Sequence, residues 1–205
     1  MIPHKTSERL ILYKYFLEKL KAEQKPNVYS KELAEYSDNK AEQVRRDLMV
    51  VGCSGNSKNG YDVDELLDHI NKLLNTAKGV KMTLVGVGNL GKAILGYFFL
   101  MQPKFFIECA FDNDENKVKR IISGCPCYHI AEMESILKGK NIDLGVITVP
   151  GNEAQKVAET LILAGVKGIV NFSPVPIKSS NGIFVENINM AMTFEKVAYF
   201  SKLIK

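Results

Sequence analysis

The sequence predicts an α/β protein in which an N-terminal winged helix-turn-helix is followed by a Rossmann-like parallel α/β domain. Apolar residues recur at helical spacing up to about residue 74, whereas from residue 80 short β-branched runs alternate with helical stretches. A glycine-rich turn follows the first of those runs. Because the short stretch 75–79 joins the two patterns, we predict domains at residues 1–77 and 78–188, followed by a final helix at 189–205.

Four helices are predicted in the N-terminal part, each with apolar side chains on one face, over residues 7–25, 31–36, 40–50 and 62–74. Side chains suited to capping helix starts precede or open three of them: Ser7, Ser30, and Asp62 or Asp64. A polar, glycine-rich loop at 53–59 separates the last two helices. This order is typical of a winged helix-turn-helix, in which the helix after the turn enters the major groove of DNA.

The helix at 40–50 carries side chains of the types that read bases. Arg45 and Arg46 can bond guanine through two nitrogens, and Gln43 can pair with adenine. The charge balance does not itself favour DNA, because residues 1–77 hold 12 Lys and Arg against 12 Asp and Glu. A solvated helix face therefore remains an alternative interpretation.

The C-terminal part alternates apolar runs with helical stretches. Strands are predicted at residues 82–87, 106–111, 144–149 and 168–172, and helices at 90–100, 115–122, 130–137 and 152–163. Strands and helices that alternate at this length form a parallel sheet with helices on both faces.

A dinucleotide fingerprint joins the first of these strands to its helix: Gly86, Val87, Gly88, Asn89, Leu90 and Gly91. The first glycine permits a tight turn, the second lets a pyrophosphate approach the backbone, and the third lets helix and strand pack closely. Asp112 ends the next strand, where a carboxylate binds the ribose hydroxyls of NAD and disfavours the 2′-phosphate of NADP. Two alternatives remain: a glycine turn that binds nothing, and another nucleotide such as coenzyme A.

Residues suited to catalysis are scarce. A dehydrogenase with this fold needs a proton donor or acceptor beside the nicotinamide, and the three histidines are His4, His69 and His129. No nucleophile motif is present, and Cys125 and Cys127 lack the second ligand pair of a zinc site. We therefore predict neither a catalytic residue nor a metal site.

The composition is that of a globular protein, with 46% hydrophobic and 24% charged residues. No apolar run approaches the roughly 18–20 residues that span a membrane, and the first residues lack the apolar core of a secretory signal. We therefore expect a cytoplasmic protein without a membrane partner.

The two parts together resemble the Rex family of bacterial redox-sensing repressors. The motifs that carry this resemblance lie in the family's order: Arg9, Leu10 and Tyr13, then residues 30–34, 43–48, 60–63, 86–91, 111–118, 148–150, 164–169, 171–175 and 185–187. Since they run almost from end to end, the resemblance covers nearly the whole chain.

The resemblance implies a homodimer in which the final helix of each subunit packs against its partner. It further implies that NADH closes the dimer and releases a palindromic operator, while NAD+ or an empty site permits repression of fermentation and respiration genes. Such a switch requires NADH to bind the two dimer states with different affinities.

The resemblance also assigns site residues. The cofactor positions are Gly86, Val87, Gly88, Asn89, Leu90, Gly91, Tyr97, Asp112, Asn113, Lys117, Thr148, Val149, Pro150, Asn171, Ser173 and Pro174. The DNA positions are Ser30, Lys40, Gln43, Arg45, Arg46 and Lys58.

Several positions depart from the family pattern. The wing keeps one basic residue, Lys58, where the family has a basic pair. Tyr15 and Asn189 stand where the family has an arginine and an aspartate that, with the tyrosine found here as Tyr97, distinguish the cofactor states. Met190 stands where a phenylalanine is common. A neutral pair cannot make a charge-assisted contact, so a weaker redox response, or none, is an alternative. Oxidation sensing by Cys53 is a further hypothesis.

Overall fold

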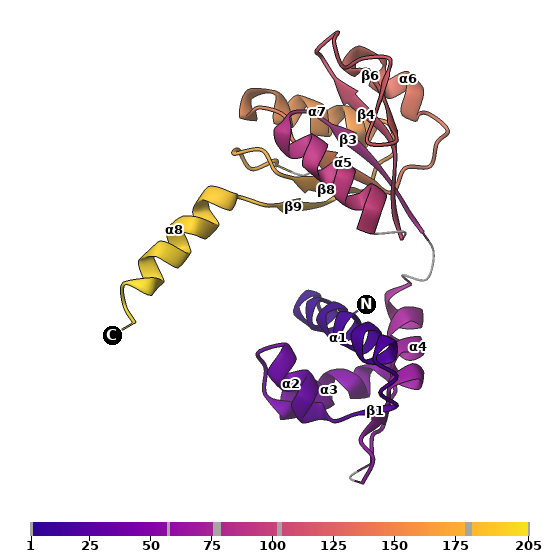
Figure 1. Cartoon of the computed structure of the whole chain (residues 1–205), viewed down its shortest axis with the longest axis vertical. Coiled ribbons are helices and arrows are strands. Elements are labelled where there is room, and N and C mark those ends of the chain that lie inside the picture. Colours follow the sequence, from indigo (N-terminus) through magenta and orange to yellow (C-terminus); the bar gives the residue numbers. More distant parts are fainter. Residues whose placement is uncertain (1, 57, 76–78, 102–103, 179–181, 205) are drawn as a thin grey trace. The chain divides into compact units, whose positions relative to one another are not determined.

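A computed structural model describes residues 2–204 except 57, 76–78, 102–103 and 179–181. The chain divides into two compact units, Met1–Lys78 and Gly79–Lys205, and each is described by itself (Figure 1). No helix among the described residues is long and apolar enough to cross a membrane.

The first unit contains four helices and a two-stranded antiparallel sheet: α1(His4–Ala22), β1(Asn27–Val28), α2(Ser30–Tyr36), α3(Ala41–Val51), β2(Tyr61–Asp62) and α4(Val63–Leu74). Its core is formed by fully buried apolar side chains from all four helices, among them Leu10, Leu17, Leu33, Leu48 and Ile70. The described residues between α3 and β2 form the wing, in which Asn56 bridges to Gly60. The predicted winged helix-turn-helix is confirmed.

Two of the predicted helix caps are wrong. The first helix begins at His4 after Pro3, so Ser7 lies within its first turn and its hydroxyl donates to the carbonyl of Pro3. Tyr29, not Ser30, occupies the cap position of α2, where the Glu32 carboxylate accepts from the Tyr29 amide. The cap of α4 is confirmed, because Asp62 accepts from the Glu65 amide at 2.9 Å.

The second unit is built on a seven-stranded sheet in the order β5-β6-β4-β3-β7-β8-β9. Its strands are β3(Val80–Val85), β4(Phe105–Asp112), β5(Arg120–Ile122), β6(Cys125–His129), β7(Leu144–Ile147), β8(Gly168–Asn171) and β9(Phe184–Asn187). All pair in parallel except β5, which is antiparallel to β6. Apart from β5, this is the order of a dinucleotide-binding fold, and the strand order reverses between β3 and β7.

Helices cover both faces of this sheet (Figure 1). Alternate residues of each strand belong to different cores: Val85 and Phe111 pack with the helices α6(Met133–Leu137) and α7(Gly151–Leu163), whereas Leu84 packs with α5(Asn89–Met101). Because successive side chains of a strand point to opposite faces of the sheet, α5 covers one face and α6 and α7 cover the other.

The helix predicted at residues 115–122 is wrong. The Asp114 carboxylate accepts from the Asn116 amide at 2.9 Å, which forms a turn, and Lys119 adopts a φ of 59°. The chain then reverses, and β5 pairs with β6 as a hairpin. The helix predicted at 130–137 is a 3-10 turn, Ile130–Glu132, followed by the short α6.

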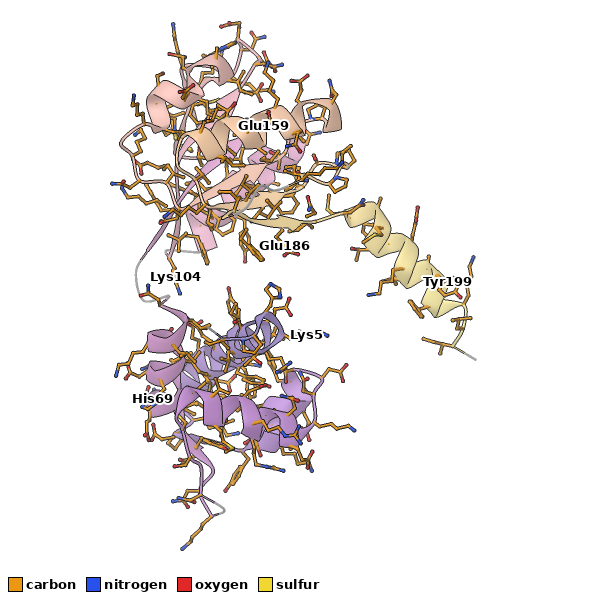
Figure 2. The ribbon with its side chains drawn as sticks, turned by 180° about the vertical axis from the view of Figure 1, so that it is seen from behind. Lys5, His69, Lys104, Glu159, Glu186 and Tyr199 are labelled. Carbon is orange, nitrogen blue, oxygen red and sulfur yellow. The ribbon has the colours of Figure 1, made fainter. Side chains whose placement is uncertain are left out.

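The final helix, α8(Met190–Ser201), buries none of its side chains in the single chain. Among its exposed apolar residues, Phe194 is 75% exposed and Tyr199, labelled in Figure 2, is 62% exposed. Isolated apolar residues on a surface are ordinary, but a whole helix of them marks an interaction surface. Asn189 caps α8, because its side-chain oxygen accepts from the Met192 amide at 3.0 Å.

Candidate cofactor and DNA-binding sites

Two of the three glycines that follow β3, Gly86 in the loop and Gly91 in the first turn of α5, are required by the fold itself. Gly86 has a φ of 99°, and a Cβ there would lie 2.8 Å from the Thr148 carbonyl carbon. A Cβ at Gly91 would overlap the Gly86 carbonyl oxygen. Packing of β3, α5 and β7 therefore explains both glycines.

Gly88 has no such explanation within the protein. Its φ is not left-handed, and apart from Gly88 itself and its two chain neighbours, no heavy atom of the described residues lies within 4 Å of the place where a Cβ would stand. This open space lies before α5, whose first turn begins where the Lys92 amide bonds the Gly88 carbonyl at 2.9 Å. A bare backbone facing open space at a helix start suits a pyrophosphate.

Thr148, Val149 and Pro150 hold the other side of this loop. The Thr148 hydroxyl lies 2.6 Å from the Gly86 carbonyl oxygen and 3.1 Å from that of Val85. Pro150 precedes α7 at the cap position. The structure therefore brings the loops after β3 and β7 together at the reversal point, where ligands bind in sheets of this kind.

The Asp112 carboxylate already bonds its own protein. One oxygen accepts from the Val87 amide at 2.6 Å and from the Lys117 ammonium at 3.1 Å, and the other accepts from the Asp114 amide at 2.9 Å. A carboxylate offers about four acceptor positions, so these three bonds leave room for about one hydroxyl. The predicted ribose contact thus stays a prediction, and Asp112 already orders the glycine loop.

Lys117 is firmly charged. Burial acts against the ammonium charge, but the hydrogen bond to Asp112 and the nearby Asp114 outweigh it and raise the pKa of Lys117. Two basic residues that the sequence did not single out, Lys92 and Arg120, line a cavity of about 390 Å³ together with Lys117. Only the fold reveals this cluster, because β5 was predicted as part of a helix.

The remaining predicted cofactor residues differ in position. Asn171, the last residue of β8, and Ser173 are buried: the Asn171 side-chain amide donates to the Val175 carbonyl and to Asn187, and its oxygen accepts from the Ser173 amide at 3.0 Å. These contacts hold the loop that contains Pro174. Asn113 is exposed after β4, and Tyr97 is 53% exposed on α5, away from the glycine loop in sequence. Their contacts with a cofactor stay predictions.

His129 lies on the adenosine half of the site. It ends β6 opposite Asp112 of β4, whereas a nicotinamide would extend toward β7 and β8. Its Nδ1 accepts from the Ala131 amide, and its Nε2 lies 3.9 Å from the Glu115 carboxylate. His69 of α4 (Figure 2) lies in the other unit, with Nδ1 3.4 Å from the Val51 carbonyl oxygen. No described group of three or more His, Cys, Asp or Glu side chains could hold a metal ion.

The four cysteines are buried free thiols. Burial raises the pKa of Cys125 to about 12 and also raises the pKa of Cys53, Cys109 and Cys127. Because the thiolate is the reactive form, these cysteines are poorly suited to oxidation sensing.

The helix α3 presents the predicted base-reading arginines to solvent. Arg45 and Arg46 are exposed, and the Arg45 guanidinium bonds the Ser30 hydroxyl at 3.1 Å and Glu42 at 3.2 Å. Lys40 is exposed immediately before the helix. The structure therefore joins Arg45, in the middle of α3, to Ser30, the first residue of α2, while Arg46 and Lys40 are exposed on and just before α3.

The wing is hydrogen-bonded to Tyr29, the residue that caps α2. The Asn56 side chain accepts from the amides of Lys58 and Asn59, and the Tyr29 hydroxyl donates to the Lys58 carbonyl at 2.9 Å. The Lys58 side chain is exposed. The backbone amide and carbonyl of Lys58, which carries this charge, are therefore both hydrogen-bonded.

Asp47 joins α1 to α3 in a cluster that the sequence did not reveal. It is 2% exposed and accepts from the Arg9 guanidinium through both oxygens, at 2.6 and 2.7 Å, and from the Tyr13 hydroxyl at 3.0 Å. Gln43 donates to the same carboxylate at 3.0 Å. Burial acts to raise the pKa of Asp47, but the hydrogen bonds from Arg9, Gln43 and Tyr13 outweigh it and hold that pKa below its usual value. Asp47 is therefore a carboxylate at neutral pH.

Tyr13 makes the first unit sensitive to alkali. Burial, with the hydrogen bond to Asp47, raises the pKa of Tyr13 from 10.0 to about 12. A raised folded pKa means that this residue's contribution to stability is fully present below pH 10 and is lost as the pH rises toward 12. We expect thermal unfolding followed by circular dichroism to show a steeper loss of stability from pH 10 to 12 than in Tyr13→Phe. Equal losses in the two proteins would contradict this assignment.

A winged helix joined to a dinucleotide-binding fold, with exposed arginines on the recognition helix, defines a class of two-domain DNA-binding proteins that can hold a nucleotide. Two known families match the corresponding parts: a putative DNA-binding protein N-terminus matches residues 1–48, and a CoA binding domain matches residues 77–175.

The chain belongs to the Rex family of redox-sensing transcriptional repressors. It is 39% identical to Rex of an Exiguobacterium species, covering 97% of this chain and 91% of that relative, and 37% identical to Rex of Lactobacillus acidophilus, covering 97% and 94%.

Solved structures of a Rex-family repressor, RSP, have the same fold along the whole chain. RSP in complex with NAD+ and operator DNA is 29% identical with a TM-score of 0.88, covering 99% of this chain and 97% of that one. RSP in complex with NADH is 28% identical with a TM-score of 0.84, covering 99% and 98%. The predicted family and fold class are confirmed.

Proposed function

We propose that this protein is a transcriptional repressor that binds operator DNA through α3 and the wing and responds to NADH and NAD+ held at the glycine loop. The single observation that carries the proposal is Gly88, a glycine whose bare backbone faces open space at the helix start. The RSP structures, with operator DNA in one and NADH in another, support both halves of it.

The glycine loop fits an NAD pyrophosphate. Gly88 leaves room for it, the start of α5 offers backbone amides, and Thr148 fixes the loop from the other side. We infer that the adenosine ribose binds beside Asp112 and Lys117, whose side chains bond each other, and that the nicotinamide half lies toward Asn171, at the end of β8, and Ser173. When bound, the cofactor supplies a nicotinamide whose oxidation state is the signal.

We infer a domain assignment of residues 1–77 for DNA binding, 78–188 for the cofactor and 189–205 for dimerisation. For NADH to release DNA, it must bind one dimer state more tightly than the other. The departures at Tyr15 and Asn189 bear on this step, because Asn189 uses its side-chain oxygen to cap α8. A repressor that holds NAD(H) with weak switching is therefore the second candidate.

The experiment that tests the proposal is an operator titration. A palindromic operator is selected from random duplexes, and binding is measured against NADH and NAD+ separately at one salt concentration, because DNA affinity depends strongly on salt. We expect NADH to release the duplex at concentrations at which NAD+ does not. Duplex binding that ignores both cofactors would remove the sensing function, and binding of no duplex would remove the repressor function.

We infer that the protein is not an enzyme and acts in the cytoplasm, where bacterial operators are found. The position of His129 on the adenosine half supports the first inference. The alternative, a small NAD-dependent oxidoreductase or CoA-binding protein, draws on the match to a CoA binding domain. Turnover of NADH with a carbonyl substrate, or a higher affinity for coenzyme A than for NADH, would favour that alternative.

We infer a homodimer formed through α8, because its apolar side chains are exposed along the helix. The double variant Phe194→Asp with Val197→Asp places charges one turn apart on one face. Burying each apolar side chain contributes about 1.5–3 kcal/mol, so we expect dimerisation to weaken by about 100-fold or more. Sedimentation velocity measures this. Lys196→Ala on the same helix is the control, and an unchanged dimer in the double variant would contradict the role of α8.

A further inference from the structure

The side chain of Gln43 is held in one orientation. Gln43 lies in the first turn of α3, and Asp47 lies one turn further along the same face, where side chains four residues apart meet. The Gln43 Nε2 donates to the Asp47 Oδ1 at 3.0 Å. Because an ionised carboxylate only accepts hydrogen bonds, the amino end of the amide must face Asp47, and the oxygen end cannot.

Asp47 itself is fixed in place. The Arg9 guanidinium bonds both of its oxygens, through Nη2 to Oδ1 and Nε to Oδ2, and α1 carries Arg9. Two parallel bonds of this kind fix the plane of a carboxylate as well as its position. With 2% of Asp47 exposed, the acceptor for Gln43 has no freedom to turn toward solvent.

The fixed amide leaves one donor and one acceptor for DNA. Gln43 is only partly buried, and when Asp47 accepts the N–H that is trans to Oε1, the second N–H lies beside Oε1 on the same planar group. An adenine edge in the major groove offers the complementary pair, the N7 acceptor and the N6 amino donor, whereas guanine offers two acceptors, N7 and O6. The amide that Asp47 orients thus matches the donor and acceptor of adenine, whereas with guanine its oxygen would face another acceptor and could not form a hydrogen bond.

We propose that Asp47, held by Arg9, is a positioning residue that orients the Gln43 amide to read one adenine in each operator half-site. This inference rests on the proposed function, since it requires α3 to enter the major groove. The start of a recognition helix is where base edges are contacted. Arg9 lies on α1 and does not itself contact bases in this proposal, but by holding Asp47 it influences which base Gln43 binds.

The first test measures base preference with the selected operator, in which each base pair is replaced in turn. For the wild-type chain, we expect one adenine position in each half-site at which guanine weakens binding by about 5- to 150-fold, as a bidentate contact implies. Gln43→Ala should remove that preference while other positions keep theirs. A preserved preference in Gln43→Ala would overturn the inference, and binding of no duplex by the wild-type chain would instead overturn the proposed function.

The second test separates positioning from stability. Asp47→Asn presents an amide that can either donate or accept, so the Gln43 amide is free to turn. We therefore expect the ratio of the affinity for the operator with adenine at this position to the affinity for the operator with guanine to fall by about 5-fold or more. Ile70→Val on α4 is the control, because it removes one buried methylene from the same core without touching this cluster. An unchanged ratio in both variants, or an equal fall in both, would overturn the positioning role. Arg9→Lys, which keeps the charge but loses the second bond, provides the same comparison if Asp47→Asn does not fold.

Discussion

Replacing Gly88 with alanine should remove most NADH binding while the second unit stays folded. The backbone at Gly88 is not left-handed, and the added methyl group meets no described atom of the protein. It would instead occupy the space that a pyrophosphate needs. If the overlap costs about 1–3 kcal/mol, the affinity falls by about 5- to 150-fold, which isothermal titration calorimetry with NADH can measure.

Two glycines of α5 provide controls for Gly88→Ala. Gly96→Ala adds a methyl group to the same helix, with its nearest neighbour, the Ser123 hydroxyl, at 4.0 Å, so NADH affinity should not change. Gly91→Ala should destabilise the unit, because its Cβ would overlap the Gly86 carbonyl oxygen. Unchanged NADH affinity in Gly88→Ala would show that the dinucleotide does not bind across this loop.

The double variant Arg45→Ala with Arg46→Ala should strongly weaken operator binding and leave NADH affinity unchanged. Both side chains are exposed on α3 and belong to the first unit, whereas the glycine loop belongs to the second. A bidentate base contact contributes about 1–3 kcal/mol, so the loss of two weakens binding by about 30-fold or more. Fluorescence anisotropy with labelled operator checks this.

The matched control for the arginine pair is Lys19→Ala with Lys72→Ala. It removes the same number of charges from the same unit, at exposed positions on α1 and α4. Operator affinity in this control should change little. If both double variants lose affinity equally, bulk charge and not α3 holds the DNA, and the recognition-helix assignment is wrong.

Local patterns predicted most of the fold. The glycine turn and the apolar runs around it indicated a parallel sheet because each depends on residues within one strand and one helix. The hairpin of β5 and β6 was missed because Val118 and Ile122 have helical spacing, while the turn depends on Asp114 bonding an amide two residues away and on the left-handed Lys119. Such turn chemistry outweighs apolar spacing in a short segment.

The site was harder to predict where distant residues meet. The sequence indicated that Asp112 follows a strand, but not that the Val87 amide, 25 residues earlier, already bonds its carboxylate. Likewise, Arg9 and Asp47 are 38 residues apart, and no periodicity links α1 to α3. From the sequence, Asn189 was interpreted only as the loss of the aspartate that the family has at this position. In the fold, its side chain caps α8.

Because the cysteine thiols are buried, we expect this protein not to respond to thiol-reactive chemicals. Peroxides and electrophiles attack thiolates, and a cysteine such as Cys125, whose pKa is about 12, carries almost no thiolate at neutral pH. Cys53, the cysteine within the wing, is 8% exposed, and burial raises its pKa as well. A repressor with such thiols would respond to the ratio of NADH to NAD+. It would not respond to peroxides or electrophiles that leave this ratio unchanged.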